Sequence, residues 1–244
     1  MEIIKLENVS KHFGGLEAVK DVSLDIEKGM IFGLIGPNGA GKTTLFNIIS
    51  GYLSPTTGKI LLNGENITGL QPFQICKKGL ARTFQLVKPF NDMSVLDNVI
   101  VGCFLAINKL KDAREKATRI LEEVGLEGKK NYLAKNLTIA DRKRLELART
   151  LSTDPIILLL DEVMAGLTRK ETNDLIGLLR RIRERGISLF LIEHVMHAIM
   201  SLSERIAILH HGKKIMEGKP KEVVNDERVI RAYLGDEYDV TRGK

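Results

Sequence analysis

Tryptophan is absent from this sequence of 244 residues, and only 5% of the residues are aromatic. Proteins that bind single-stranded nucleic acid usually stack the bases on aromatic side chains. The two basic runs, 142–144 and 180–181, have no such aromatic platform beside them. Although the formal net charge is +6, we therefore expect no nucleic-acid partner, and we expect both runs to lie on solvated helix faces.

Cysteines and long apolar runs are also scarce. Cys76 and Cys103 are too few for a disulfide framework, so we expect free thiols in a reducing compartment. The longest apolar run, 99–107, is shorter than the ~20 residues that a membrane-spanning helix needs. The first residues lack the pattern of a secretory signal. Together these observations predict a cytoplasmic protein.

The segment 36–44 is the most informative part of what the sequence does contain. It reads Gly-Pro-Asn-Gly-Ala-Gly-Lys-Thr-Thr and fits the pattern G-x-x-x-x-G-K-S/T. An apolar run over 30–35 precedes it and apolar residues at helical spacing follow it, as expected for a strand, a phosphate-binding loop and a helix. Glycines let the backbone approach a ligand, while consecutive N–H groups and the helix N-terminus attract anionic oxygens.

A nucleotide phosphate site is therefore predicted in this segment. Lys42 is expected to reach the β- and γ-phosphates, and Thr43 to place its hydroxyl on Mg²⁺. The predicted ligand-binding residues of the loop are Gly36, Asn38, Gly39, Ala40, Gly41, Lys42, Thr43 and Thr44.

The first third of the chain has the pattern of β-structure. Residues 3–26 are expected to form strands with a turn at 13–15, and 60–67 a hairpin with a tight turn at 63–64. We predict that this third is a β-rich lobe that carries the phosphate-binding loop.

A helical pattern follows. Ser94 and Thr138 are candidate N-caps, and Gly125 is a candidate C-cap. We predict a single domain in which a helical lobe, 86–151, is inserted into a core made of 1–85 and 152–244.

Buried strands return after this lobe. Apolar runs at 156–160 and 188–192 flank an amphipathic helix at 170–185, which indicates a mostly parallel sheet. A hairpin is expected within 205–217 and a last helix at 220–234. The predicted fold class is α/β: a core with a mostly parallel sheet, an antiparallel β lobe and an inserted helical lobe.

Polar residues follow the buried strands at the edge where open α/β sheets bind ligands. Asp161 is predicted to hold Mg²⁺ through water, and Glu162 to polarise the attacking water. His194 follows the next strand and is expected to contact the γ-phosphate or that water. Gln85 ends an extended segment and could add an amide oxygen near Mg²⁺, but its spacing alone does not single it out. The predicted catalytic residues are Glu162, His194 and Lys42, and the predicted metal ligands are Thr43 and Asp161.

These residues together, in this order and spacing, resemble the ATP-binding subunit of an ABC transporter, from Leu6 to Leu234. The resemblance implies a P-loop NTPase fold with ATP and Mg²⁺ as cofactors. It also implies that Phe13 stacks on adenine and that His194 is the switch histidine. Gln85 matches the Q-loop residue, and the resemblance therefore adds it to both the catalytic set and the metal set.

The sequence departs from the family pattern in the signature motif. The family usually has Leu-Ser-Gly-Gly-Gln, whereas 137–141 reads Leu-Thr-Ile-Ala-Asp. In the family this segment binds the γ-phosphate of ATP held by a second subunit, which implies a head-to-tail dimer with Thr138 as the hydroxyl donor. Ile139 and Ala140 lack the conformational freedom of the glycines. The position that is usually the D-loop aspartate is Thr168.

Four further segments, 13–16, 82–85, 191–194 and 230–235, resemble the subfamily that serves branched-chain amino acid importers. This resemblance implies a transmembrane permease partner, an external solute-binding protein acting indirectly, and a peripheral place on the cytoplasmic face of the membrane. It also implies that the helical lobe and residues 86–90 dock the permease.

Two alternatives stay open. The altered signature suits a nucleotide-gated subunit that hydrolyses ATP weakly beside a homologous partner. The second alternative is an ABC ATPase of a non-transport machine. Those proteins usually carry a long coiled-coil insertion or a second cassette, and neither fits in 244 residues.

Overall fold

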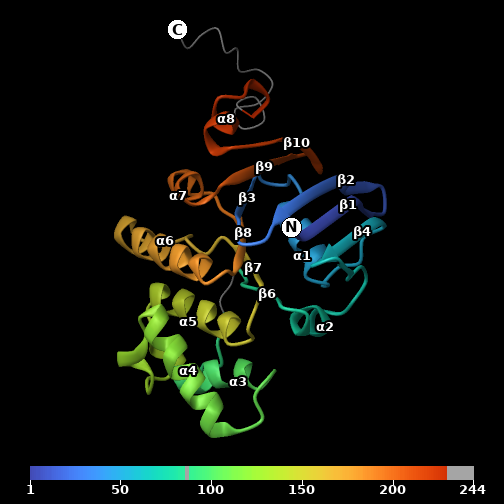
Figure 1. The fold of residues 1–244 in the computed structure, drawn as a ribbon. Helices are drawn as coiled ribbons and strands as arrows, with labels where there is room; N and C mark the ends of the chain where they lie inside the picture. The colour runs from blue at the N-terminus through green and yellow to red at the C-terminus, as the bar shows by residue number, and fades with distance from the viewer. Residues whose placement is uncertain (86–87, 230–244) are drawn as a thin grey trace.

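The computed structural model describes residues 1–85 and 88–229, whose strands form two sheets (Figure 1). The antiparallel sheet has the order β2-β1-β4-β5, and the larger sheet has the order β10-β9-β3-β8-β7-β6. The first comprises β1 (Glu2–Phe13), β2 (Leu16–Glu27), β4 (Thr57–Leu62) and β5 (Glu65–Asn66). The second comprises β3 (Ile31–Ile35), β6 (Leu80–Arg82), β7 (Ile157–Asp161), β8 (Ser188–Ile192), β9 (Arg205–His210) and β10 (Lys213–Gly218).

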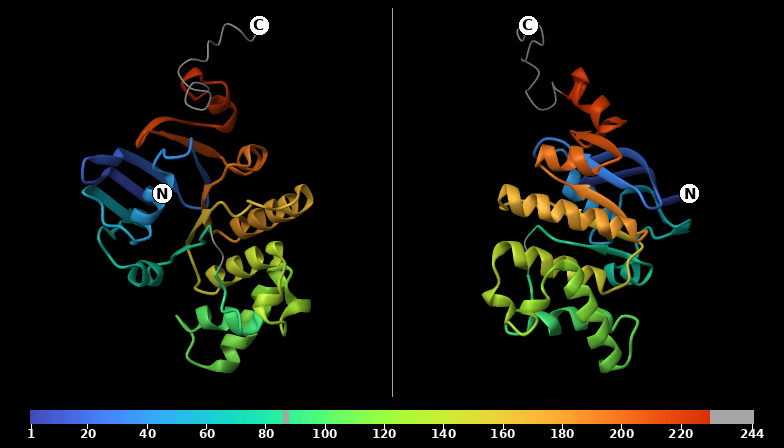
Figure 2. Two further views of the ribbon diagram at one scale, coloured as in Figure 1. Left: turned by 180° about the vertical axis from the view of Figure 1, so that it is seen from behind. Right: turned by 60° about the vertical axis from the view of Figure 1, so that its left-hand side comes forward.

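The helices of the described residues belong to three regions of the chain. Two follow the first strands: α1 (Lys42–Ile49) and α2 (Pro72–Lys77). Three form the middle region: α3 (Val95–Cys103), α4 (Leu110–Val124) and α5 (Ile139–Leu151), with short 3₁₀ turns at Glu127–Lys129 and Ala134–Asn136. The last are α6 (Arg169–Glu184), α7 (Met196–Leu202) and α8 (Pro220–Val224). Figure 2 shows α3, α4 and α5 together at one end of the molecule and α8 at the other.

The β-structure predicted for the first third is confirmed. β1 pairs antiparallel with β2, and β4 with β5. The turn between β4 and β5 is formed by Asn63 and Gly64, which both have positive φ angles of 49° and 83°. These angles are the ones that a two-residue hairpin turn requires, and Asn-Gly adopts them readily.

The sheet that carries the phosphate-binding loop differs from the prediction. The loop follows β3, which belongs to the larger sheet and pairs in parallel with β8 and β9, not with the strands of the antiparallel lobe. All five residues of β3 are buried, so other elements must pack on both faces of this strand. A strand inside the larger sheet meets this requirement. In contrast, β1 and β2 alternate between buried and exposed residues along much of their length.

The larger sheet is parallel except for the β9–β10 pair, which confirms both the parallel sheet and the hairpin expected at 205–217. Leu159 and Phe190 pack on one face with α1 and the antiparallel sheet. Leu158 and Leu189 pack on the other face with α5 and α6. Helix α1 therefore lies between the two sheets, and the phosphate-binding loop is held from both sides.

The middle helices begin and end where their capping residues predict. Ser94 caps α3 by accepting a hydrogen bond from the backbone N–H of Asp97 at 3.0 Å, and Gly125 follows α4 with a φ of 75°. Helices α3, α4 and α5 share one hydrophobic cluster with the larger sheet. The bounds of the helical lobe stay a prediction; residues 86–87 and 230–234, which the predicted lobe and last helix include, lie outside the described residues.

Phe190 offers a test of the packing between the sheets. Its ring is fully buried and lies 5.4 Å from the centroid of Phe32 and 4.8 Å from that of Phe46. We expect Phe190→Ala to lower the free energy of unfolding by about 3–5 kcal/mol, because the cavity cannot close around a sheet. Urea denaturation measures this change. Phe73→Ala is the control, since that ring is 62% exposed, and equal losses in the two variants would contradict the assignment.

Candidate functional site

The phosphate-binding loop lies between β3 and α1, with a backbone that only glycine can adopt at two positions. Gly36 and Gly41 have φ angles of 154° and 100°. A Cβ on Gly41 would lie 2.4 Å from the carbonyl oxygen of Ala18, and one on Gly36 would lie 2.1 Å from that of Leu209. The loop is therefore packed between β2 and β9, and this packing fixes where its N–H groups point.

Lys42 is the first residue of α1 and lies inside the loop. Its ammonium donates to the carbonyl oxygens of Gly36 at 2.7 Å and Pro37 at 3.0 Å. Burial lowers the pKa of this ammonium, and the carboxylates of Glu162 and Asp161 oppose that shift. The positive charge thus lies near two carboxylates and is held by carbonyls that a phosphate group can replace.

A cavity of about 530 Å³ opens in front of the loop. It brings together most of the ligand-binding and catalytic residues that the sequence predicted, from five separate parts of the chain. The predicted residues that line it are Phe13, Asn38, Gly39, Ala40, Gly41, Lys42, Thr43, Thr44, Gln85, Glu162 and His194. Gly36, Asp161 and Thr138 are not among its lining residues.

Three of the predicted catalytic residues make direct contact at one side of this cavity. The amide nitrogen of Gln85 donates to one carboxylate oxygen of Glu162 at 2.7 Å. The Nε2 atom of His194 lies 3.0 Å from the other oxygen. Both oxygens of Glu162 are therefore oriented by neighbours that come from different strands, which suits a group that must hold a water molecule in one place.

Asp161 lies behind Glu162 and is almost fully buried. Its carboxylate forms an ion pair of 2.8 Å with Arg82, whose guanidinium also donates to the side chains of Asn47 at 2.6 Å and Ser50 at 3.0 Å. The sequence reasoning did not single out Arg82 as part of the site. The sequence signal that could have identified Arg82 was its position in a predicted strand, because a charged residue buried in a parallel sheet needs a partner of opposite charge.

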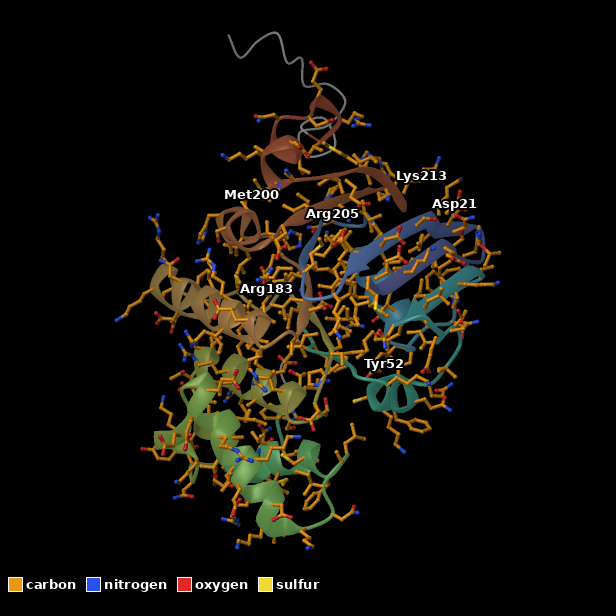
Figure 3. All side chains as sticks on the ribbon, viewed as in Figure 1. Asp21, Tyr52, Arg183, Met200, Arg205 and Lys213 are labelled. Atoms are coloured by element: carbon orange, nitrogen blue, oxygen red, sulfur yellow. The ribbon has the colours of Figure 1, made fainter. Side chains whose placement is uncertain are left out.

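The three residues predicted to bind Mg²⁺ line a second cavity, of about 700 Å³. Thr43, Gln85 and Asp161 offer a hydroxyl, an amide and a carboxylate, and oxygen donors of this kind are the ones that Mg²⁺ prefers. The residues therefore fit this ion. The aromatic rings of Tyr52 (Figure 3) and Phe84 also line the cavity and meet edge to face at 5.6 Å.

The signature segment begins α5. The Thr138 hydroxyl accepts from the backbone N–H of Asp141 at 3.2 Å and donates to the Asp141 carboxylate at 2.8 Å. Lys129 neutralises that carboxylate through an ion pair of 2.5 Å. The capping role expected of Thr138 is confirmed. The side chain of Ile139, which replaces a glycine of the usual motif, is exposed.

The prediction that the run 142–144 is a solvated helix face is wrong for Lys143. This residue is only 8% exposed, and its ammonium donates to the backbone carbonyl oxygen of Glu162 at 3.1 Å. Residues three and four apart share a helix face, and Glu146 and Leu147 are buried too. Lys143 therefore belongs to the face of α5 that packs on the core. The run 180–181 is exposed, as expected.

Glu193 is a buried carboxyl group beside this network, and its ionisation gives a test. It accepts from the backbone N–H of Met164 at 2.9 Å, and burial raises its pKa to about 7, with partial opposition from Met164 and Lys143. A carboxyl that binds its proton more tightly when folded stabilises the fold at low pH, and this stability is lost as pH rises from about 4.5 to about 7.

We therefore expect Glu193→Gln to melt at the same temperature as the unchanged chain at pH 5. At pH 8 the variant should melt ~5 °C higher, because glutamine carries no charge to bury. Thermal unfolding followed by circular dichroism at the two pH values measures the difference. A difference that is the same at both pH values would show that the ionisation of Glu193 is not its source.

The comparisons with known proteins agree with this geometry. The family model described as ABC transporter matches residues 19–165, and one described as branched-chain amino acid ATP-binding cassette transporter matches residues 213–239. The chain is 39% identical to the high-affinity branched-chain amino acid transport ATP-binding protein BraF of Pseudomonas aeruginosa, over 96% of this chain and 98% of that protein.

Solved structures agree as well. A nucleotide-free ATP-binding cassette from an ABC transporter matches with a TM-score of 0.89 and 30% identity, over 97% of this chain and 100% of that one. A dimeric ATP-binding cassette in a post-hydrolysis state, bound to ADP and Pi, matches with a TM-score of 0.80 and 26% identity, over 89% and 98%. In the described part of this chain, no helix has the length and apolar character to span a bilayer. The chain belongs to the ABC transporter family and is one of its ATP-binding, ATP-hydrolysing cassettes.

Proposed function

We propose that this chain is the ATPase subunit of an importer for branched-chain or related amino acids. The contact of Gln85 and His194 with Glu162, at the edge of a cavity lined by the phosphate-binding loop, is the observation that carries the ATPase assignment. The substrate class rests on the function printed for BraF and on the match of the C-terminal family model.

The loop and its neighbours hold the nucleotide in this proposal. The ring of Phe13, 46% exposed at the cavity, stacks on adenine, and the loop N–H groups receive the phosphates. Lys42 exchanges the carbonyls of Gly36 and Pro37 for β- and γ-phosphate oxygens. Thr43, Gln85 and Asp161 would hold Mg²⁺, which would supply positive charge that offsets the negative charge of the phosphates.

Glu162 accepts a hydrogen bond from the attacking water and orients it toward the γ-phosphate. Gln85 and His194 hold the two carboxylate oxygens, so that the water has one defined position. As charge moves on the γ-phosphate, Lys42 and His194 stabilise it, which is the main contribution that a protein can make to phosphoryl transfer.

A second cassette and a permease complete the proposed machine. The dimeric cassette among the similar structures supports a pair of cassettes. In the proposed pair, which is arranged head to tail, Thr138 of one chain faces the γ-phosphate held by the other. The partner is a second copy or a homologue. In this proposal the helical lobe, 86–151, and within it residues 86–90 dock the permease, so the chain binds the cytoplasmic face of the membrane peripherally. The solute-binding protein then acts only through the permease.

A weakly hydrolysing partner subunit is the second candidate. The side chain of Ile139 is 62% exposed in the signature, where the family usually has a glycine. A side chain there keeps the backbone further from a phosphate than glycine does. In this case the chain closes on ATP, and a homologous partner performs most of the hydrolysis.

Two measurements separate these functions. The purified chain, given Mg²⁺ and ATP, releases phosphate if it is the ATPase; hydrolysis only after a homologous cassette is added favours the second candidate. Proteoliposomes that contain the chain with its permease and solute-binding protein should then take up radiolabelled leucine in an ATP-dependent way. ATP-dependent uptake of an unrelated solute, with leucine excluded, would overturn the substrate class.

A further inference from the structure

The backbone of Glu162 is in an unusual conformation. Its φ angle is 51°, in the left-handed region that residues other than glycine rarely adopt. A residue in this region carries backbone strain and persists only where neighbouring groups hold it. Its N–H donates to the carbonyl oxygen of Ile192 at 2.9 Å, which ties it to β8.

The second tie to this backbone comes from α5. The carbonyl oxygen of Glu162 accepts from the ammonium of Lys143 at 3.1 Å. Within residues 1–85 and 88–229, this is the only hydrogen bond of that ammonium. Lys143 is 8% exposed and is not among the residues that line the nucleotide cavity.

Two opposed influences act on the Lys143 ammonium at this buried place. Burial lowers its pKa, and the charged forms of Glu193, Glu146 and Glu162 oppose that shift. The carbonyl oxygen of Glu162 also accepts from the backbone N–H of Ala165 at 3.2 Å, so the ammonium of Lys143 is its second donor and the one that comes from α5. A charge-assisted bond of this kind is stronger than one between neutral groups.

Helix α5 also contacts the segment that carries Gln85, whose amide binds the Glu162 carboxylate. Glu146, one turn after Lys143, accepts from the backbone N–H of Phe84 at 2.6 Å, and Phe84 precedes Gln85. The same helix therefore contacts the backbone of Glu162 and the segment whose amide orients the Glu162 carboxylate. Its N-terminus carries the signature residue Thr138.

From this geometry we propose that Lys143 is a positioning residue for ATP hydrolysis, which fixes the left-handed backbone of Glu162 and so links its aim to the position of α5. The proposal deepens the function proposed above and rests on Glu162 as the residue that orients water. It assigns to a lysine of the signature helix a role that acts through Glu162 and not through contact with substrate.

Lys143→Met tests the proposal, because methionine keeps the apolar stem and loses the donor. We expect kcat to fall by about 10- to 100-fold, since small displacements of a catalytic group have effects of this size. The KM for ATP should stay within about 3-fold, because Lys143 lies outside the nucleotide cavity. Lys143→Arg, which keeps charge and donors, should recover most of the lost turnover.

Lys116→Met is the matched control. Lys116 also donates its ammonium to a backbone carbonyl, that of Ser152 at 2.8 Å, but on α4 and without contact to Glu162. Its loss should leave turnover within about 2-fold of the unchanged chain. If Lys143→Met lowers kcat no more than Lys116→Met does, or raises KM in parallel with the loss of kcat, the proposal is wrong.

Two further measurements keep the result decisive. In a chain that already carries Glu162→Gln, Lys143→Met should cause almost no additional loss, because both changes act on one group; multiplied losses would contradict this. Hydrogen exchange of the peptide that covers 161–164 should become about 10-fold faster in Lys143→Met, and stay unchanged in Lys116→Met. The exchange result decides the backbone role even if the unchanged chain has no turnover, an outcome that would count against the proposed function alone.

Discussion

Glu162→Gln is expected to bind ATP with unchanged affinity and to lose at least ~100-fold of its turnover, because glutamine keeps the shape of the side chain and loses the negative charge that orients water. Gln85 and His194 contact the two carboxylate oxygens at 2.7 and 3.0 Å, so the new amide stays in the same place. Phosphate release measures turnover, and fluorescence of a labelled ATP analogue measures binding. With Mg²⁺ and ATP, the variant should accumulate as the closed dimer in size-exclusion chromatography.

Glu184→Gln is the control for this change, since Glu184 is an exposed carboxylate at the end of α6 and is not among the residues that line the nucleotide cavity. It should hydrolyse ATP at the rate of the unchanged chain. Turnover in Glu162→Gln at that same rate would remove Glu162 from its proposed role, whatever its contacts are.

The local parts of the site were predictable because single segments encode them. The spacing of glycines in 36–44 predicts the phosphate-binding loop. The structure shows why glycine is needed at 36 and 41, since a Cβ at either position would collide with a backbone carbonyl oxygen. The capping of α5 by Thr138 follows from two residues three positions apart. The positions of Asp161 and His194 at one sheet edge follow from the rule that parallel strands end together.

The sheet order was not predictable in the same way. β3 was assigned with its neighbours in sequence, but it pairs with β8 and β9, which lie more than 150 residues later. Non-local pairing depends on which strand can be covered on both faces, and the burial of all five β3 residues is the physical reason.

Buried charged residues were the second feature that could not be predicted from the sequence. Arg82 and Lys143 are polar residues whose partners, Asp161 and the carbonyl of Glu162, come from distant parts of the chain. A charged residue is usually solvated, so sequence reasoning assigned the run 142–144 to the surface. Only the fold reveals that the turn of α5 that carries Lys143 faces the catalytic backbone.

Lys42→Met is expected to lower the affinity for ATP by ~100-fold or more, because the variant loses the only ammonium among the predicted phosphate ligands. In the unchanged chain this ammonium is bound to two loop carbonyls, and it must leave them when phosphate arrives. The exchange replaces neutral acceptors with charged ones, and this difference favours binding. Isothermal titration with ATP and Mg²⁺ measures the loss.

A loss of affinity in Lys42→Met has an alternative explanation. Without the two hydrogen bonds from the ammonium to the carbonyl oxygens of Gly36 and Pro37, the loop could lose its structure. If Lys42→Met acted by releasing the loop, its melting temperature would fall well below that of Lys28→Met, because Lys28 is exposed and is not among the residues that line the nucleotide cavity. We expect instead similar melting temperatures, because Gly36 and Gly41 remain packed against Leu209 and Ala18 whichever residue occupies position 42. Lost affinity in a loop that stays folded would assign the ammonium to the phosphates, whereas affinity within about 3-fold of the unchanged chain would exclude it from them.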